Sequence, residues 1–339
     1  MSKYDPPTLR LLRLVLLLSA ASIAWPASAL PNELEPGPLA PSERVGVFYY
    51  PWFGTAKHDG RYAHWQQGGS RPPLVVASSF YPARGVYSSA DALVVDAQMR
   101  EIAGAGIGVV ISSWWGRDSV EDRRLMQLLG AARRHGLTVA AHIEPYRGRT
   151  VASTEADILY LRGLGISDVY VWASPQLPDA EWAEMNRRLE GVRVFANTNL
   201  AGRAAAGGFD GLYTYDVLLF DGVLFPRLCH QARRLHLLCA PSVGPGYDAR
   251  QATGDLRVKP RRNGARYDAM WRGAIRAQPD LVTITSYNEW HEGTQIEPAR
   301  SDRPGYESYE GAWGLSGRAA ETAYLDRTAF WVQRLTRLR

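Results

Sequence analysis

Apolar and polar positions follow two patterns along this chain. Short runs of five to seven residues, rich in Val, Ile, Leu and aromatic residues, fit buried strands. The longer segments between them repeat their apolar positions about every 3.6 residues, as amphipathic helices do. The predicted strands are 45–50, 107–113, 137–142, 168–172, 193–197, 211–215, 237–242 and 281–286. The predicted helices are 90–105, 120–135, 152–164, 178–190, 223–235, 267–278 and 317–338.

Strands that alternate with helices predict an α/β protein with a parallel sheet. Eight such strands match a closed (β/α)8 barrel, also called a TIM barrel, with extended βα loops. The connection 198–208 has the weakest helical pattern. No low-complexity linker divides the chain, so we expect one catalytic domain over residues 30–339.

The first 29 residues have the pattern of a secretory signal peptide. Lys3, Arg10 and Arg13 precede the apolar run 14–25, and an Ala-Ser-Ala triplet ends at Ala29. A membrane anchor is the alternative, but the run is shorter than the roughly 20 residues that a spanning helix needs. There is no Cys for lipid attachment and no twin-arginine pair. We therefore expect an exported protein, periplasmic or secreted, without a stable membrane anchor.

The charge balance gives no reason to expect a nucleic-acid partner. Removal of 1–29 takes away three basic residues and one acidic residue, so the formal net charge falls from +5 to +3. Basic residues cluster only at Lys259, Arg261 and Arg262, which we interpret as a solvated loop rather than an anion site. The two cysteines, Cys229 and Cys239, fall in a predicted helix and the strand after it. A disulfide and a pair of buried thiols both fit this placement.

Polar and aromatic residues stand at the end of almost every predicted strand. In a barrel the carboxyl ends of the strands surround one mouth, so these residues should converge there. An aromatic wall with polar groups between the rings suits a sugar, whose C–H faces stack while its hydroxyls take hydrogen bonds. Among the tryptophans, we favour the site for Trp52, Trp65, Trp114 and Trp115.

The eighth strand leads into two carboxylates, Glu289 and Glu292, which are bracketed by Asn288, Trp290 and His291. Two carboxyl groups can divide the work of glycoside cleavage, one protonating the departing oxygen and the other acting on the anomeric side. Their three-residue gap serves one site only if the segment forms a tight loop or helical turn. A solvated acidic loop with one carboxylate capping a helix is the alternative, and spacing alone does not decide between them.

Other chemistries fit the sequence less well. The segment HEGTQ, from His291 to Gln295, lacks the second His of a zinc-protease motif, so we expect no metal. The glycines at Gly244 and Gly246 have neither phosphate-loop nor dinucleotide spacing, and we expect no cofactor. No Gly-x-Ser-x-Gly elbow occurs.

A series of motifs resembles glycoside hydrolase family 99, the endo-acting α-mannosidases and α-mannanases. In chain order they are VFYYPWFG, DGRYAHW, SSFYPARGVYSS, SWWG, HIEPY, FDGLYTYD, PSVGPGY and ITSYNEWHEGTQIE. The resemblance implies a (β/α)8 barrel that cleaves inside α-mannosidic chains with retention and without a metal. It also implies an unusual mechanism, in which the substrate's own 2-hydroxyl attacks the anomeric carbon and forms a 1,2-anhydro sugar.

The same resemblance implies roles for individual residues. Glu289 would be the base on the 2-hydroxyl, and Glu292 would be the general acid toward the leaving group and then the base that activates water. Because the base must be ionised and the acid protonated, the site should separate two similar pKa values. The implied substrate-binding residues are Tyr50, His64, Trp114, Glu144, Tyr215 and Asn288. Where the family has an Arg-Pro-Trp-Asn segment this chain has DARQATGDLRVKPRRNG, in which Arg250 is the candidate replacement for the arginine.

We therefore predict a retaining endo-α-mannosidase-like hydrolase that acts as a monomer on an oligosaccharide or polysaccharide. The first alternative keeps the catalytic design but acts on another exported polymer, such as an exopolysaccharide or an α-glucan. The second is a barrel that binds carbohydrate without cleaving it.

Overall fold

The computed structural model describes residues 39–337, so the predicted signal peptide lies outside the described residues. A parallel sheet of nine strands forms the centre of the fold, and a short antiparallel hairpin lies apart from it. The sheet contains β1 (Ser42–Tyr49), β2 (Ile107–Trp114), β3 (Thr138–Ile143), β4 (Asp168–Val171), β5 (Arg193–Asn197), β6 (Gly211–Tyr213), β7 (Leu238–Ala240), β8 (Ser242–Val243) and β11 (Val282–Ile284). The hairpin contains β9 (Tyr247–Asp248) and β10 (Val258–Lys259).

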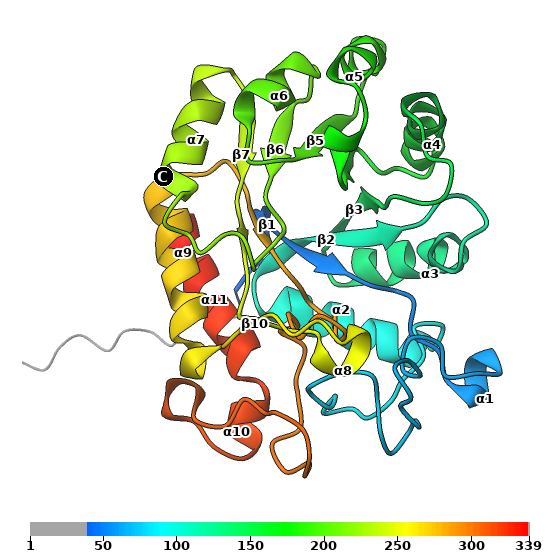
Figure 1. The fold of residues 1–339 in the computed structure, drawn as a ribbon, viewed down its shortest axis with the longest axis vertical. Coiled ribbons are helices and arrows are strands. Elements are labelled where there is room, and N and C mark those ends of the chain that lie inside the picture. Colours follow the sequence, from blue (N-terminus) through cyan, green and yellow to red (C-terminus); the bar gives the residue numbers. More distant parts are fainter. Residues whose placement is uncertain (1–38, 338–339) are drawn as a thin grey trace, which may run out of the picture. The chain divides into compact units, whose positions relative to one another are not determined.

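Helices connect the strands and surround the sheet (Figure 1). The longer ones are α2 (Ala92–Gly104), α3 (Val120–Arg134), α4 (Val151–Gly163), α5 (Asp179–Asn186), α7 (Phe225–Arg234), α9 (Ala265–Ala277) and α11 (Ala323–Arg337). The short ones are α1 (Ala56–Asp59), α6 (Ala201–Ala206), α8 (Arg250–Thr253) and α10 (Arg318–Glu321), with 3-10 turns at Ser174–Gln176, Arg262–Gly264 and Ala312–Gly314. The weakly patterned connection 198–208 thus contains the short helix α6, and the predicted helix 317–338 is divided into α10 and α11.

The sheet closes into the predicted TIM barrel. Its strand order is β7-β6-β5-β4-β3-β2-β1-β11-β8, and β7 and β8 are separated along the chain only by Pro241. The predicted strand 237–242 is therefore interrupted, because proline has no N–H to continue the ladder. Its first half pairs with β6 and its second half with β11, where Ser242 is opposite Thr283.

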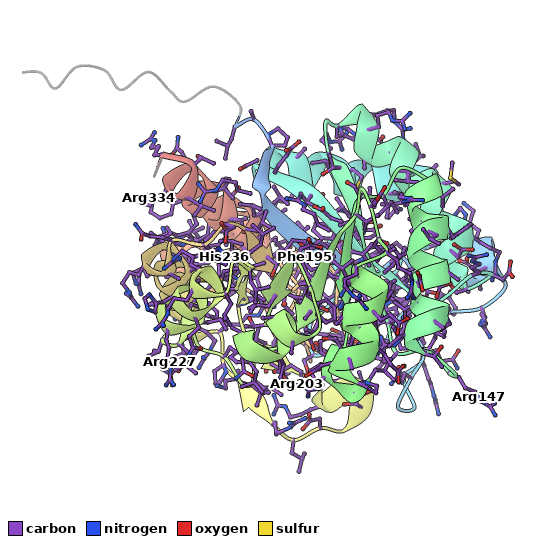
Figure 2. The ribbon with its side chains drawn as sticks, turned by 90° about the horizontal axis from the view of Figure 1, so that it is seen from above. Arg147, Phe195, Arg203, Arg227, His236 and Arg334 are labelled. Carbon is purple, nitrogen blue, oxygen red and sulfur yellow. A yellow bond between two sulfur atoms is a disulfide. The ribbon has the colours of Figure 1, made fainter. Side chains whose placement is uncertain are left out.

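Local signals place the helices as the periodicity predicted. The hydroxyl of Ser119 caps α3 by accepting from the N–H of Asp122, and Thr150 and Ser153 form a reciprocal capping box at α4. Inside the barrel, aromatic rings fill the space between the strands. Phe195, which lies among the strands in Figure 2, stacks on Tyr170 with ring centroids 4.6 Å apart.

A disulfide joins Cys229 on α7 to Cys239 on β7, with 5.3 Å between the two Cα atoms. This settles the question that the sequence left open. Within residues 39–337, no helix is long and apolar enough to cross a membrane.

The two ends of the barrel can be followed in Figure 2. Arg147, Arg203 and Arg227 lie along the lower edge of that view, and each lies in the connection that follows a strand. Arg334, near the end of α11, lies on the opposite side. The carboxyl ends of the strands therefore lead toward the side of Arg147, Arg203 and Arg227.

Candidate active site

One pocket of about 180 Å³ lies at the carboxyl ends of the strands. Its walls combine aromatic rings with three carboxyl groups and a histidine. The lining residues are Tyr50, Trp52, Trp115, His142, Glu144, Pro145, Trp172, Tyr215, Glu289 and Glu292. His142 lies near the end of β3, and the others follow β1, β2, β3, β4, β6 and β11, so residues from distant parts of the chain converge as a barrel mouth requires.

The segment after β11 is a compact loop that fixes Glu289. The hydroxyl of Ser286 accepts from the backbone N–H of Glu289 at 2.8 Å, and the N–H of Ser286 donates to the carbonyl of Thr294 at 3.0 Å. Toward the neighbouring strand β1, the N–H of Tyr287 donates to the carbonyl of Phe48 at 2.8 Å. Because Glu289 is buried in this loop, the alternative of a solvated acidic loop is wrong.

Burial is the main reason that the pKa of Glu289 lies well above its ordinary value. The nearby carboxyls of Glu292 and Glu144 raise the pKa further by like-charge repulsion. Two backbone N–H groups, those of His291 and Glu292, act in the other direction because they stabilise the ionised form. The N–H of His291 donates to Oε1 of Glu289 at 3.1 Å.

Glu292 is half-buried, and its pKa is raised to about 7. Desolvation is the largest cause, followed by the charges of Asp216 and Glu144 and, more weakly, of Asp255. An interaction with the Tyr215 hydroxyl lowers the pKa in part. The pKa values of both glutamates are therefore raised above that of an ordinary glutamate.

Glu144 is held by a chain of side chains from neighbouring strands. The hydroxyl of Ser113 donates to its Oε1 at 2.8 Å, and Nδ1 of His142 lies 3.1 Å from the same oxygen. The other ring nitrogen of His142 hydrogen-bonds to the Tyr213 hydroxyl at 2.8 Å. One oxygen of Glu144 is thus engaged, while the residue also lines the pocket.

Two tyrosines meet beside the glutamates. The hydroxyls of Tyr50 and Tyr215 hydrogen-bond to each other, and both side chains are buried. Tyr215 adopts a positive φ of 49°, which turns it at the end of β6. Desolvation and the nearby carboxylates raise both tyrosine pKa values, so both hydroxyls stay protonated near neutral pH.

Two histidines support the ring of Trp52. His64 stacks on it with centroids 4.4 Å apart and an interplanar angle of 3°, and the ring of His291 lies 6.0 Å from it. Burial lowers the pKa of both histidines, that of His64 to about 3. Both rings are therefore neutral at pH 7 and form an uncharged stack behind one wall of the pocket.

The structure brings five predicted site residues together in the pocket: Tyr50, Glu144, Tyr215, Glu289 and Glu292. It does not place the other four there. His64 lies beside Trp52, and Asn288 is buried with its amide bonded to the backbone of Tyr50.

Trp114 and Arg250 also point elsewhere. Trp114 donates from Nε1 to Asp122 on α3 at 2.9 Å, so its ring lies between the sheet and the helices. Arg250 forms a two-point ion pair with Asp248, at 2.9 and 2.6 Å, and also contacts Glu307 at 3.1 Å. Neither side chain lines the pocket, so a role of Trp114 or Arg250 in binding sugar stays a prediction.

The tryptophans divide into two groups. Trp52 and Trp115 line the pocket as expected, whereas Trp65 is buried against Phe53 and donates to a backbone carbonyl. Trp172, which ends the fourth predicted strand, also lines the pocket, as expected of a residue at a strand end.

The basic cluster is not a solvated loop throughout. Arg261 packs over the rings of Phe80, Tyr309 and Tyr324, and it donates to the backbone of the loop that carries Glu292. Those rings are distant in sequence, so no local pattern could have shown this contact.

The chemistry of the pocket is that of acid–base work on neutral hydroxyl groups. None of its lining residues is Lys or Arg, so it carries no charge complement for an anionic group. Its carboxyls can accept or give protons, and its rings can stack on C–H faces. Within residues 39–337, no group of three or more His, Cys, Asp and Glu side chains is arranged to hold a metal ion.

Comparison with known proteins gives a consistent picture. The family model of glycosyl hydrolase family 99 matches residues 41–170 and 166–337. A glycoprotein endo-alpha-1,2-mannosidase-like protein of Danio rerio is 31% identical over 315 residues, which cover 75% of this chain and 71% of the relative. A glycoprotein endo-alpha-1,2-mannosidase of Mus musculus is 29% identical over 370 residues, which cover 91% of this chain and 76% of the relative.

A solved structure is similar over almost its whole length. The GH99 endo-alpha-mannosidase from Bacteroides thetaiotaomicron superposes with a TM-score of 0.80 and 28% identity. The match covers 88% of this chain and 99% of that protein.

Proposed function

The chain belongs to glycosyl hydrolase family 99 and is a glycoside hydrolase, and from this premise we propose that it cleaves internal α-mannosidic bonds with retention. The observation that carries the proposal is the meeting of Glu289, Glu292 and Glu144 in one aromatic pocket at the strand ends. The substrate follows from the relatives, which are named as endo-acting α-mannosidases.

In the first step, Glu289 takes the proton of the sugar's 2-hydroxyl, and that oxygen attacks the anomeric carbon. The bond between the anomeric carbon and the leaving oxygen breaks, and Glu292 gives its proton to that oxygen. The products are a 1,2-anhydro sugar and a shortened chain. Glu289 is then protonated and Glu292 is ionised.

In the second step, Glu292 removes a proton from water, which adds to the anomeric carbon. The anhydro ring opens, and its oxygen recovers a proton from Glu289. Two inversions at one carbon give net retention, and both glutamates return to their starting states. No carboxylate becomes covalently bound to the sugar.

The surroundings of the two glutamates favour these roles. Glu289 has two backbone N–H donors that favour its carboxylate, although burial and the charges of Glu292 and Glu144 raise its pKa overall. Glu292 is near Asp216, Glu144 and Asp255, whose charges favour its acid form. The remaining oxygen of Glu144 can accept from a sugar hydroxyl, and Trp115 and Trp172 offer faces for stacking.

The test is hydrolysis of a panel of glycans read out by product mass. We expect internal cleavage of an α-linked mannan, lost in Glu289→Gln and in Glu292→Gln. Glu307→Gln, at an exposed glutamate outside the pocket, serves as the control and should keep activity. Turnover of exopolysaccharides or α-glucans without turnover of mannan would replace the substrate in this proposal. Tight glycan binding without turnover would refute it.

We further propose that the enzyme is exported, that its signal peptide is removed after Ala29, and that the mature enzyme works as a monomer. Support comes from the charged, apolar and small-residue order of residues 1–29. Mass spectrometry of the purified mature chain and light scattering in solution test the two statements.

A further inference from the structure

Arg261 binds the loop that carries Glu292. Its Nη2 donates to the carbonyl of Gly293 at 2.9 Å and to the carbonyl of Gln295 at 2.7 Å. Gly293 is the residue directly after Glu292, so the first of these bonds acts on the peptide unit that follows Gly293, one unit beyond the glutamate. The same side chain thus holds two carbonyls two residues apart.

Three aromatic rings hold the guanidinium of Arg261 next to these two carbonyls. Its carbon lies 4.6 Å from the ring centre of Phe80, 4.7 Å from that of Tyr309 and 4.6 Å from that of Tyr324. Contacts of this kind attract a cation to the ring faces. The charge of Arg261 also lowers the pKa of Glu307, so Arg261 is attracted to that carboxyl as well as to the rings and the two carbonyls.

A second contact fixes the same stretch of backbone. The N–H of Asp248, on β9, donates to the carbonyl of Glu292 itself at 2.7 Å. The backbones approach so closely that a Cβ on Gly293 would lie 2.9 Å from the carbonyl oxygen of Asp248. Gly293 also has a φ of 63°, a backbone conformation that residues with a side chain rarely adopt. Both the close approach and the conformation therefore favour glycine at this position.

Arg261 also joins this contact to the β9–β10 hairpin. It follows β10 by two residues, and a Cβ on Gly246, just before β9, would lie 2.9 Å from its Cγ. Asp248 and Arg261, one at each end of the segment 248–261, therefore both hydrogen-bond to the backbone of the loop that carries Glu292.

We propose that Arg261 is a positioning residue for Glu292, holding the general acid at the leaving oxygen. This inference rests on the proposed function, in which Glu292 protonates that oxygen. A small displacement of an acid strongly reduces proton transfer, while the attack by the 2-hydroxyl depends on Glu289, whose backbone N–H bonds to the Ser286 hydroxyl and not to Arg261. Loss of Arg261 should therefore harm leaving-group protonation in particular.

The experiment compares two substrates that differ only in the leaving group. One is an α-mannan oligosaccharide, whose sugar oxygen must be protonated, and the other is the corresponding α-glycosyl fluoride, which needs much less acid assistance. For Arg261→Met we expect kcat/KM on the oligosaccharide to fall about 100-fold or more and on the fluoride less than about 5-fold. Arg261→Lys, which keeps the charge but cannot form the same fork, should show the same direction with a smaller loss.

Arg233→Met is the matched control. Arg233 also donates to two backbone carbonyls, those of Ala277 and Gln278 at 3.0 and 3.1 Å, but far from the pocket. It should leave the ratio between the two substrates unchanged. Glu292→Gln provides the reference pattern for lost acid catalysis.

The possible outcomes distinguish a failure of the positioning role of Arg261 from a failure of the proposed hydrolase function. Equal losses on both substrates in both Arg261 variants would overturn the positioning role and leave the hydrolase proposal intact. If the wild type cleaves neither substrate, both proposals fail. Should Arg261→Met not fold, the substrate ratio of Arg261→Lys alone decides.

Discussion

The side-chain amide of Asn288 pairs with the backbone of Tyr50 in both directions. Oδ1 accepts from the N–H of Tyr50 at 2.7 Å, and Nδ2 donates to its carbonyl at 3.0 Å. The pair joins the loop after β11 to the end of β1 and so fixes the tyrosine that meets Tyr215 in the pocket. Asn288 therefore acts on the pocket through Tyr50.

Substitution of Asn288 should disturb both stability and turnover. Asn288→Ala leaves two buried backbone groups without partners, which costs about 2–4 kcal/mol of unfolding free energy. Turnover should fall at least about tenfold because Tyr50 loses its anchor. Urea unfolding and kcat/KM measure the two effects. Asn186→Ala, which removes one bond to the carbonyl of Gly207 outside the pocket, should keep turnover. Unchanged turnover in Asn288→Ala would contradict the role.

The raised pKa of Glu292 predicts the pH dependence of the first step. As general acid it must be protonated, so kcat/KM should decline as pH rises through about 7. Asp216 contributes the largest neighbouring charge, and Asp216→Asn should move this alkaline limb to lower pH. The amide can still accept from the N–H of Leu218, as the carboxylate does at 2.7 Å. Asp221→Asn, a similar turn residue, is the control. A limb that stays in place would refute the assignment.

The same pKa predicts how stability changes with pH. The pKa of Glu292 is about 7 in the folded state against 4.5 for an ordinary glutamate, so the folded state holds the proton more tightly. Ionisation therefore costs stability increasingly between these two pH values, and fully above about 7. Glu292→Gln avoids this cost. Because the residue is half-buried, we expect a gain of only about 2 kcal/mol at pH 8 and almost none at pH 4. Unfolding in urea at both pH values tests this, and a gain that is independent of pH would contradict it.

Most of the barrel could be predicted because each strand is a compact apolar run followed by a helical period. The failures have local causes. The run 237–242 contains Pro241, which interrupts the ladder, and α6 lies in a stretch of alanine and glycine without an apolar stripe. Neither the proline nor the alanine and glycine stretch is visible in the spacing of large apolar residues, on which the prediction of strands and helices depended.

The site was predictable where it depends on strand ends, and less so where it depends on side-chain direction. Trp114 and Trp115 are neighbours, but successive side chains at a strand point to opposite faces, so one meets α3 and the other the pocket. The contacts of Arg261 and Asn288 join residues far apart in sequence. Only the folded chain shows that these two side chains hold the loop and the first strand.

A buried carboxylate, Glu297, closes the loop that begins after β11. Four side chains donate to it: Nε of Arg84 at 2.8 Å, the hydroxyl of Tyr87 at 2.7 Å, Nε2 of Gln98 at 2.8 Å and Nε1 of Trp290 at 2.8 Å. Trp290 lies between the two catalytic candidates in sequence. The network thus ties the loop to the core behind the pocket.

Glu297→Gln should therefore be strongly destabilising. The amide has one acceptor oxygen in place of two and leaves Arg84 with Glu101 as its remaining ion-pair partner, which costs about 2 kcal/mol. Activity per folded molecule should also fall, because Trp290 loses a bond. Glu184→Gln, which removes an exposed pair with Arg188, should change stability by less than about 0.5 kcal/mol. Denaturant unfolding compares the two, and similar values would show that the network contributes little.

The disulfide between Cys229 and Cys239 should stabilise the fold without taking part in catalysis. It closes a loop with a sequence separation of 10, for which the loss of chain entropy in the unfolded state predicts about 3 kcal/mol. The double variant Cys229→Ser and Cys239→Ser should therefore unfold at a lower temperature by several degrees. Its kcat/KM should match the wild type, because neither cysteine lines the pocket. Thermal unfolding with and without reductant provides the measurement: reductant should lower the Tm of the wild type and leave that of the double variant unchanged. A wild-type Tm that does not respond to full reduction would contradict a stabilising role.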